Sequence, residues 1–92
     1  MNDYVYCISY DLRSPGRNYD DLITAIKSFG HWWHQTESVW FIVSDKDVVL
    51  IRDFLMNYID RNDKLFVIEV KNPWAGTGFT NKEYEWLKNN LN

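Results

Sequence analysis

The segment Tyr4-Val5-Tyr6-Cys7-Ile8-Ser9-Tyr10-Asp11 is made of strand-forming residues and ends on a carboxylate. A second segment, Gln35-Thr36-Glu37-Ser38-Val39-Trp40-Phe41-Ile42-Val43, reads as a polar turn followed by another apolar strand. Strict alternation would place the even-numbered residues of the first strand on one face of a sheet and the odd-numbered residues on the other. Both of these strands, and the later segment 64–71, are apolar on both sides, so the sheet needs cover on both faces.

The rest of the chain alternates between strand and helix patterns. Strands are predicted over 4–10, 31–35, 38–43 and 64–71. Helices are predicted to begin near Asn18, Ser44 and Thr80, because apolar residues recur at helical spacing after each of them. The resulting order is strand, helix, strand, strand, helix, strand, with an appended helix. This order predicts an α+β fold, a ferredoxin-like βαββαβ sandwich with both main helices on one face of an antiparallel sheet and a C-terminal helix added.

Three helix starts have recognisable capping residues. Asn18 with Asp21, and Ser44 with Asp47, resemble capping boxes, while Thr80 with Glu83 matches the motif fully. Gly30 is placed to end the first helix.

Length and composition limit the possible architectures and partners. Ninety-two residues suffice for one domain, predicted over 1–92 with a core at 4–71 and a C-terminal loop and helix at 72–91. Ten basic residues against thirteen acidic ones give a net charge of −3, and the basic residues are scattered, which argues against strong duplex binding by one subunit. The single Cys7, the absence of a basic leader and the lack of an apolar run of about 20 residues predict a soluble cytoplasmic protein with no membrane partner.

Two helices on one face leave the other face of a doubly apolar sheet exposed. The last helix is expected to cover part of it. A second copy of the chain is the natural source of the remaining cover, so we expect a homodimer.

Three short motifs together resemble a known group of proteins. They are Tyr10-Asp11-Leu12, then Gln35 with Ser38-Val39-Trp40, and the run from Ile59 through Leu65. They resemble the small dimeric CRISPR-associated proteins of the adaptation complex, the second Cas protein, and the wider superfamily that includes VapD ribonucleases. The likeness covers about residues 4 to 70 and is closer still to short SinR-like bacterial and phage proteins.

The resemblance implies a ferredoxin-like homodimer and a role for Asp11. In nuclease members the matching Asp approaches its dimer mate and helps to hold a divalent cation, Mg²⁺ or Mn²⁺, that activates water for phosphodiester cleavage. A metal-dependent endoribonuclease is the activity implied. The chain departs from the CRISPR members because it lacks their Arg-rich first helix and their extra C-terminal strand, so a role beside the CRISPR integrase is not expected. From the residues alone, a turn-forming role is favoured for Asp11 over that of a metal ligand, by roughly two to one, and the resemblance brings the two interpretations close to parity.

A phosphate site is predicted next to Asp11. Arg13 and Arg17 flank Ser14-Pro15-Gly16 in a loop that leads to a helix N-terminus, where backbone N–H groups favour anions. Ser9 shares a face with Asp11 and is a candidate secondary contact. The alternative is two solvated loop arginines.

Aromatic residues supply candidate base-stacking positions. Alternation puts His31 and His34 on opposite faces, so the motif His31-Trp32-Trp33-His34 does not predict a zinc site. One of its tryptophans is expected in the core and the other on a base or in a dimer interface, and Trp33 is the nucleotide-binding candidate. Trp74, near Gly76 and Gly78, either fills the core or contacts a base.

These observations favour a homodimer that binds RNA or DNA, with metal-dependent cleavage at paired Asp11 residues as the implied reaction. The alternative is a non-enzymatic module that binds a small, for example cyclic, nucleotide or a protein partner in bacterial or phage defence.

Overall fold

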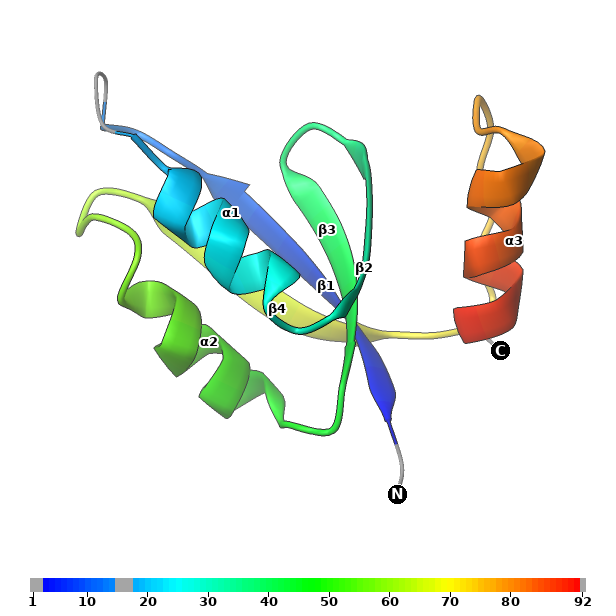
Figure 1. Ribbon diagram of the computed structural model, residues 1–92, viewed down its shortest axis with the longest axis horizontal. Helices are drawn as coiled ribbons and strands as arrows, with labels where there is room; N and C mark the ends of the chain where they lie inside the picture. Colours follow the sequence, from blue (N-terminus) through cyan, green and yellow to red (C-terminus); the bar gives the residue numbers. More distant parts are fainter. Residues whose placement is uncertain (1–2, 15–17, 92) are drawn as a thin grey trace.

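The computed structural model describes residues 3–14 and 18–91. The elements lie in the predicted order (Figure 1): β1 (Tyr4–Asp11), α1 (Asp20–Lys27), β2 (His31–Thr36), β3 (Val39–Ser44), α2 (Val48–Met56), β4 (Lys64–Val70) and α3 (Asn81–Asn90). The fold is therefore α+β, with a four-stranded sheet and three helices in the described residues.

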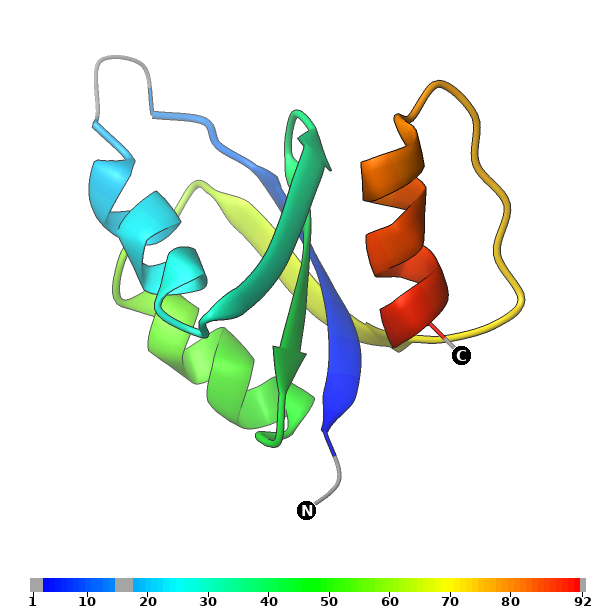
Figure 2. The ribbon, with the colours of Figure 1, turned by 45° about the vertical axis from the view of Figure 1, so that its right-hand side comes forward.

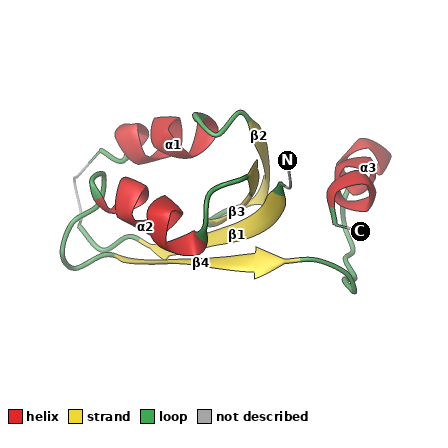
Figure 3. Ribbon diagram, turned by 90° about the horizontal axis from the view of Figure 1, so that it is seen from below, coloured by secondary structure: helices red, strands yellow, loops and turns green. Residues whose placement is uncertain are grey.

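The sheet has the strand order β2-β3-β1-β4, and every neighbouring pair is antiparallel. β1 is central, while β2 and β4 form the two edges. Helices α1 and α2 lie side by side over one face of the sheet (Figure 3), which we call the helix face. Helix α3 stands apart from them, next to the end of the sheet where the N-terminus lies (Figures 1 and 2). We call the face on which α3 packs the outer face.

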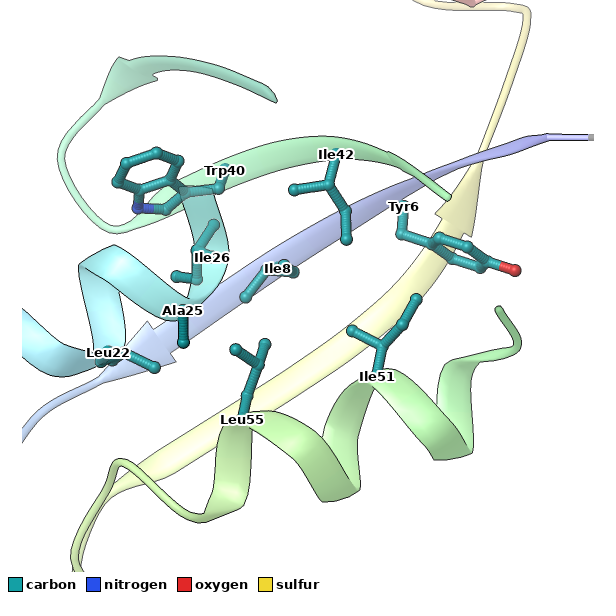
Figure 4. Close-up of a cluster of buried hydrophobic side chains, with 9 residues drawn as sticks. All are labelled: Tyr6, Ile8, Leu22, Ala25, Ile26, Trp40, Ile42, Ile51 and Leu55. Carbon is teal, nitrogen blue, oxygen red and sulfur yellow. The ribbon is translucent and has the colours of Figure 1, made fainter. Parts of the chain in front are cut away.

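The main core lies between the helix face and the two helices α1 and α2 (Figure 4). The even-numbered residues of β1 and β3 point into it, as the alternation predicts. Its buried members come from two strands, β1 and β3, and from the apolar stripes of α1 and α2: Tyr6, Ile8, Leu22, Ala25, Ile26, Trp40, Ile42, Ile51 and Leu55. Leu65 and Val67 of β4 pack against this cluster from the edge of the sheet.

A second, smaller core lies under α3 on the outer face. Its buried members are Val5, Trp33, Leu87 and Leu91, and aromatic residues from β3, the 72–79 loop and α3 pack around them. The expectation that the last helix covers part of the outer face is confirmed. The cover reaches Val70 at the end of β4 but leaves Phe66 and Ile68 of the same strand exposed.

Two of the predicted helix starts are wrong by a few residues. α2 begins after Asp47, whose carboxylate accepts the Leu50 N–H at 2.9 Å, and Ser44 is instead the last residue of β3. The strand continues through Ser44 because this residue still pairs with Tyr4 of β1. The Ser44 hydroxyl accepts the Lys46 N–H and so forms the turn that precedes the helix.

The first helix also starts later than predicted. Its N-cap is Tyr19, which makes no side-chain cap, while the Asn18 side chain accepts the Asp20 N–H at 2.8 Å. Asn18 therefore lies one residue before the N-cap, and the capping box predicted for Asn18 and Asp21 does not form. At the other end Gly30 adopts φ +88°, the left-handed conformation in which glycine is favoured, as its predicted role as helix stop requires.

The third helix start is confirmed. Thr80 accepts the Glu83 N–H, and the Glu83 side chain accepts the Thr80 N–H at 2.8 Å, which completes a capping box. The β2–β3 hairpin turns at 37–38, one residue later than predicted, and its register shifts between Trp33 and Thr36.

Candidate functional site

Asp11 and Arg13, two of the predicted site residues, pair with each other at the end of β1. The Arg13 guanidinium donates to one Asp11 oxygen, Oδ2, from Nε at 3.0 Å and from Nη2 at 2.7 Å. Both side chains are more than half exposed, so the pair contributes at most about 1 kcal/mol to stability. The pair matters more for ligand binding than for stability, because the positive charge of Arg13 and the negative charge of Asp11 compensate each other.

The position of this pair is fixed by Asp63, which the sequence analysis did not single out as a site residue. One oxygen of its carboxylate accepts the Arg13 backbone N–H at 2.6 Å, and the other accepts the Asp60 N–H at 2.8 Å. The Tyr19 hydroxyl donates to the same carboxylate, at 2.9 Å and 2.8 Å from its two oxygens. Asp63 thereby joins the loop after β1 to the loop before β4. In the sequence, the polar run Asp60-Arg61-Asn62-Asp63 indicates a turn before β4 but not this role.

Next to the pair, β1 and β4 form an uncovered part of the outer face. Asp11 lies opposite Lys64, and Ser9 lies opposite Phe66. The Phe66 side chain is 54% exposed. A shallow depression of about 270 Å³ runs between the strands and is lined by Ser9, Tyr10, Lys64, Leu65 and Phe66. The structure thus brings Ser9, Asp11 and Arg13 together with an exposed aromatic ring and a lysine that were not among the predicted site residues.

Cys7 lies one alternation further along the same face, opposite Ile68. Burial raises the pKa of its thiol, since the low-dielectric surroundings disfavour the thiolate. Cys7 is therefore a poor nucleophile, as its mid-strand position indicates.

Trp33 does not join this site, and the stacking role predicted for it does not fit the structure. Its side chain is only 5% exposed, and its ring stacks on Phe41 with centroids 5.2 Å apart. Its Nε1–H donates to the Glu83 carbonyl at 3.2 Å. The reason is that the apolar side chains of the outer face need cover, and α3 supplies it by packing on the Trp33 ring. Trp32 is the exposed member of the pair and lies beneath the Lys27 ammonium.

Trp74 belongs to the same region as Trp33. It is half-buried, packs against the second core, and lines a mainly apolar cavity of about 220 Å³ together with Trp33 and Phe79. This favours the core-filling alternative for Trp74. Arg17, the remaining predicted phosphate contact, lies outside the described residues.

The two histidines of β2 point away from each other, as the alternation predicts. His34 stacks on Trp40 of the main core at 3.7 Å, whereas His31 pairs with Val43. Across residues 3–14 and 18–91, no group of three or more His, Cys, Asp or Glu residues is placed to hold a metal ion.

The donor set around Asp11 does not fit a divalent cation within one copy of the chain. Mg²⁺ and Mn²⁺ require several oxygen ligands, and here a single carboxylate already accepts two N–H groups from Arg13. A cation at this position would have to displace the guanidinium from Oδ2.

No family model matches the chain, and no curated protein or solved structure is significantly similar to it. Within the described residues, no helix is long and apolar enough to cross a membrane.

Proposed function

We propose that this protein binds single-stranded nucleic acid on the part of the outer face that α3 leaves uncovered. The observation that carries the proposal is the exposed Phe66 ring. It lies opposite Ser9 on the outer face, two residues along β4 from Lys64. An aromatic ring on a sheet surface stacks on any base, and each stacked base contributes about 1–3 kcal/mol. Lys64 supplies positive charge for an adjoining phosphate, and Arg13, whose charge Asp11 partly compensates, adds to it.

The charge distribution favours a short single strand as the ligand. With a net charge of −3 and few basic residues near Phe66, the protein offers little neutralisation to a duplex, whose affinity depends mainly on phosphate contacts. A single strand leaves its base faces accessible for stacking. The site therefore suits one or two stacked bases with one or two phosphates.

The same reasoning bears on the small-nucleotide alternative. The depression beside Phe66 measures about 270 Å³ and is shallow, which is slightly below the roughly 300–1,000 Å³ typical of pockets that enclose small ligands. An open platform for a strand fits this shape better than an enclosing pocket for a cyclic nucleotide.

For the fold, we propose the ferredoxin-like class, as in the CRISPR-associated, VapD and SinR-like proteins that the sequence resembles. The support is the βαββαβ order, with β1 central, β2-β3-β1-β4 across the antiparallel sheet, and α1 and α2 on one face. This proposal covers the fold and carries no activity with it.

We assign Asp11 to positioning rather than to cleavage. Its carboxylate holds the Arg13 side chain at the edge of the platform, while Asp63 holds the Arg13 backbone. Metal-dependent cleavage would need Arg13 to leave Asp11 and further ligands to arrive.

The test is a binding titration of a fluorescent 12-nucleotide RNA, followed by anisotropy, with single-stranded DNA, duplex RNA and a mononucleotide as the other arms. We expect both single strands to bind more tightly than the duplex or the mononucleotide. Phe66→Ala should weaken single-strand binding by about 5- to 150-fold, the equivalent of one stacked base. Leu50→Ala is the matched control, because Leu50 is similarly exposed, at 56%, but lies on α2. Equal binding by the parent and Phe66→Ala, or preference for the mononucleotide, would contradict the proposal.

A further inference from the structure

The two edges of the sheet differ in how well they are protected from pairing with another strand. β2 carries an irregularity in its register between Trp33 and Thr36, a feature that disturbs edge pairing. β4 runs in unbroken register along β1 from Lys64 to Val70 and contains neither proline nor glycine. No described strand lies beyond it (Figure 3). β4 is thus a long, regular edge strand.

The direction of the backbone groups of β4 follows from the ladder. The Tyr10 N–H donates to the Ser38 carbonyl, so the even-numbered residues of β1 direct their backbone groups toward β3. The odd-numbered residues of β1 therefore bond the even-numbered residues of β4. The N–H and C=O groups of Leu65, Val67 and Glu69 consequently point to the free edge.

The side chains of β4 are also suited to burial. On the outer face Phe66 and Ile68 are 54% and 51% exposed, which is unusual for two neighbouring large apolar residues on one strand face. An exposed apolar edge strand is a template for pairing with another strand unless something covers it.

On the helix face, a hollow of about 290 Å³ opens between the α2 end and this edge. Arg52 and Arg61 line it, together with Asp60, Asp63 and the apolar residues Met56, Ile59 and Leu65. Glu69 lies four residues along β4 from Leu65, on the same face of the strand. Its charge is opposite to that of the two arginines.

We propose that β4 pairs antiparallel with β4 of a second copy, about a two-fold axis at Val67. In this register Leu65 lies opposite Glu69 of the second copy, whose carboxylate comes next to Arg52 and Arg61. Phe66 lies opposite Ile68 on the outer face. The outward backbone groups of Leu65, Val67 and Glu69 bond those of the second copy.

The charges at the ends of β4 select this register. Centred on Val67, pairing also sets Lys71 of the second copy opposite Asp63. Centred on Phe66, pairing would oppose Glu69 to Asp63, a like-charge pair. Centred on Ile68, it would oppose Lys71 to Leu65 and so move Lys71 away from Asp63. Like charges directly opposite each other are destabilising, so only the Val67-centred register is complementary at both ends.

The dimer joins the two sheets into one and sets each Phe66 beside Ile68 of the second copy on a continuous outer face. The inference rests on the edge of β4 and does not depend on the proposed function. The two Lys64 residues lie six positions apart along the paired strands, which is about 20 Å. Each Asp11 lies opposite its own Lys64, one strand further out. The two Asp11 carboxylates are then too distant to share a cation.

Sedimentation of the full chain tests the pairing and its charges. We expect a species of twice the 11.1 kDa chain mass. Glu69→Arg or Arg61→Glu should each weaken the dimer at least tenfold, and the two changes combined in one chain should restore it. Glu85→Arg on α3 has the same charge change away from the edge and should have no effect. A chain that stays monomeric at all concentrations, or a dimer insensitive to both reversals, would overturn the proposal.

A cysteine at the axis tests the register. In a Cys7→Ala background, Val67→Cys should form an intermolecular disulfide, because directly opposed residues of a hydrogen-bonded pair lie about 5.5 Å apart between Cα atoms. Leu65→Cys in the same background should remain reduced, since two copies of it would lie about 14 Å apart. Circular dichroism confirms that both variants are folded. A Leu65 cross-link, or none at Val67, would overturn the register.

Discussion

The Asp63 carboxylate accepts the backbone N–H of Arg13 at 2.6 Å, although fifty residues separate them in the chain. The same carboxylate accepts the Asp60 N–H and the Tyr19 hydroxyl. One side chain therefore holds three segments: the loop after β1, the start of α1 and the turn before β4. The Asp11–Arg13 pair takes its place at the edge of the sheet from this arrangement.

Removing the Asp63 carboxylate should destabilise the protein more than removing any single partner of it. Asp63→Ala leaves two backbone N–H groups and one hydroxyl without their acceptor, and we expect a loss of about 2–3 kcal/mol in the free energy of unfolding. Urea denaturation followed by tryptophan fluorescence measures it. Tyr19→Phe removes one donor only and should cost about 1 kcal/mol. A loss from Asp63→Ala no larger than that from Tyr19→Phe would contradict the role assigned to Asp63.

Neutralising Asp11 should strengthen nucleic-acid binding if Asp11 serves only to hold Arg13. Asp11→Asn removes the charge that compensates the guanidinium while keeping a hydrogen-bond acceptor, so we expect several-fold tighter binding of single-stranded RNA. The dependence of log K on log salt should steepen by up to about 0.7, the contribution of one phosphate contact on a single strand.

The control for this prediction is Arg13→Gln, which should weaken binding and flatten the salt dependence. If Asp11 were instead a cation ligand for cleavage, Asp11→Asn would abolish Mg²⁺- or Mn²⁺-dependent cleavage of the same RNA, an effect that a positioning role does not produce.

Trp32 and Trp33 should respond very differently to truncation, although they are neighbours in the chain. Trp33 is buried under α3 and stacked on Phe41, so Trp33→Ala should cost about 3–5 kcal/mol. Trp32→Ala removes a partly exposed ring with its contacts to Lys27 and Trp40, which should cost about 1–2 kcal/mol. Thermal unfolding of both variants measures the difference. Similar losses for the two would show that α3 does not depend on the Trp33 ring.

The tryptophan pair also illustrates what the sequence could decide. Alternation correctly separated the two faces of the sheet and the two histidines, because the direction of side chains along a strand is a local property. Whether the Trp33 ring is covered depends on α3, which lies fifty residues away in sequence and accepts the indole N–H through the Glu83 carbonyl. Local pattern therefore predicted the elements and their order, and it did not predict which aromatic residue is covered.

The predicted helix starts were likewise correct where local residues decide them and wrong where pairing with a distant strand decides them. Thr80 and Glu83 were predicted correctly because both partners of the capping box are within one turn. Ser44 has an equally good capping side chain, but its pairing with Tyr4 extends β3 and moves the cap to Asp47. For the candidate site, Asp11 and Arg13 were found from the sequence, whereas Asp63 and Phe66 gain their roles only from the register of β4 on β1 and from a contact between distant loops.

The buried hydroxyl of Tyr6 should give the protein a pH-dependent stability at high pH. This hydroxyl donates to the Lys46 carbonyl at 2.6 Å, and its pKa is raised, first by burial and then by the negative charge of Glu69. The folded state therefore keeps this proton when the unfolded state, with a pKa near 10, releases it. The contribution of Tyr6 is fully present below pH 10 and is lost as the pH rises through the raised value.

Tyr6→Phe isolates this contribution. At pH 7 the variant should be less stable than the parent by about 1 kcal/mol, because the hydrogen bond to Lys46 is lost. Above pH 10 the parent should lose stability faster, so the difference between the two proteins should shrink. Urea denaturation at pH 7, 9, 10 and 11 measures it. Tyr84→Phe on α3, whose hydroxyl is not among the groups that raise the pKa of Tyr6, serves as the control and should give the pH profile of the parent. A constant difference between the parent and Tyr6→Phe across this range would show that the Tyr6 hydroxyl titrates alike in both states.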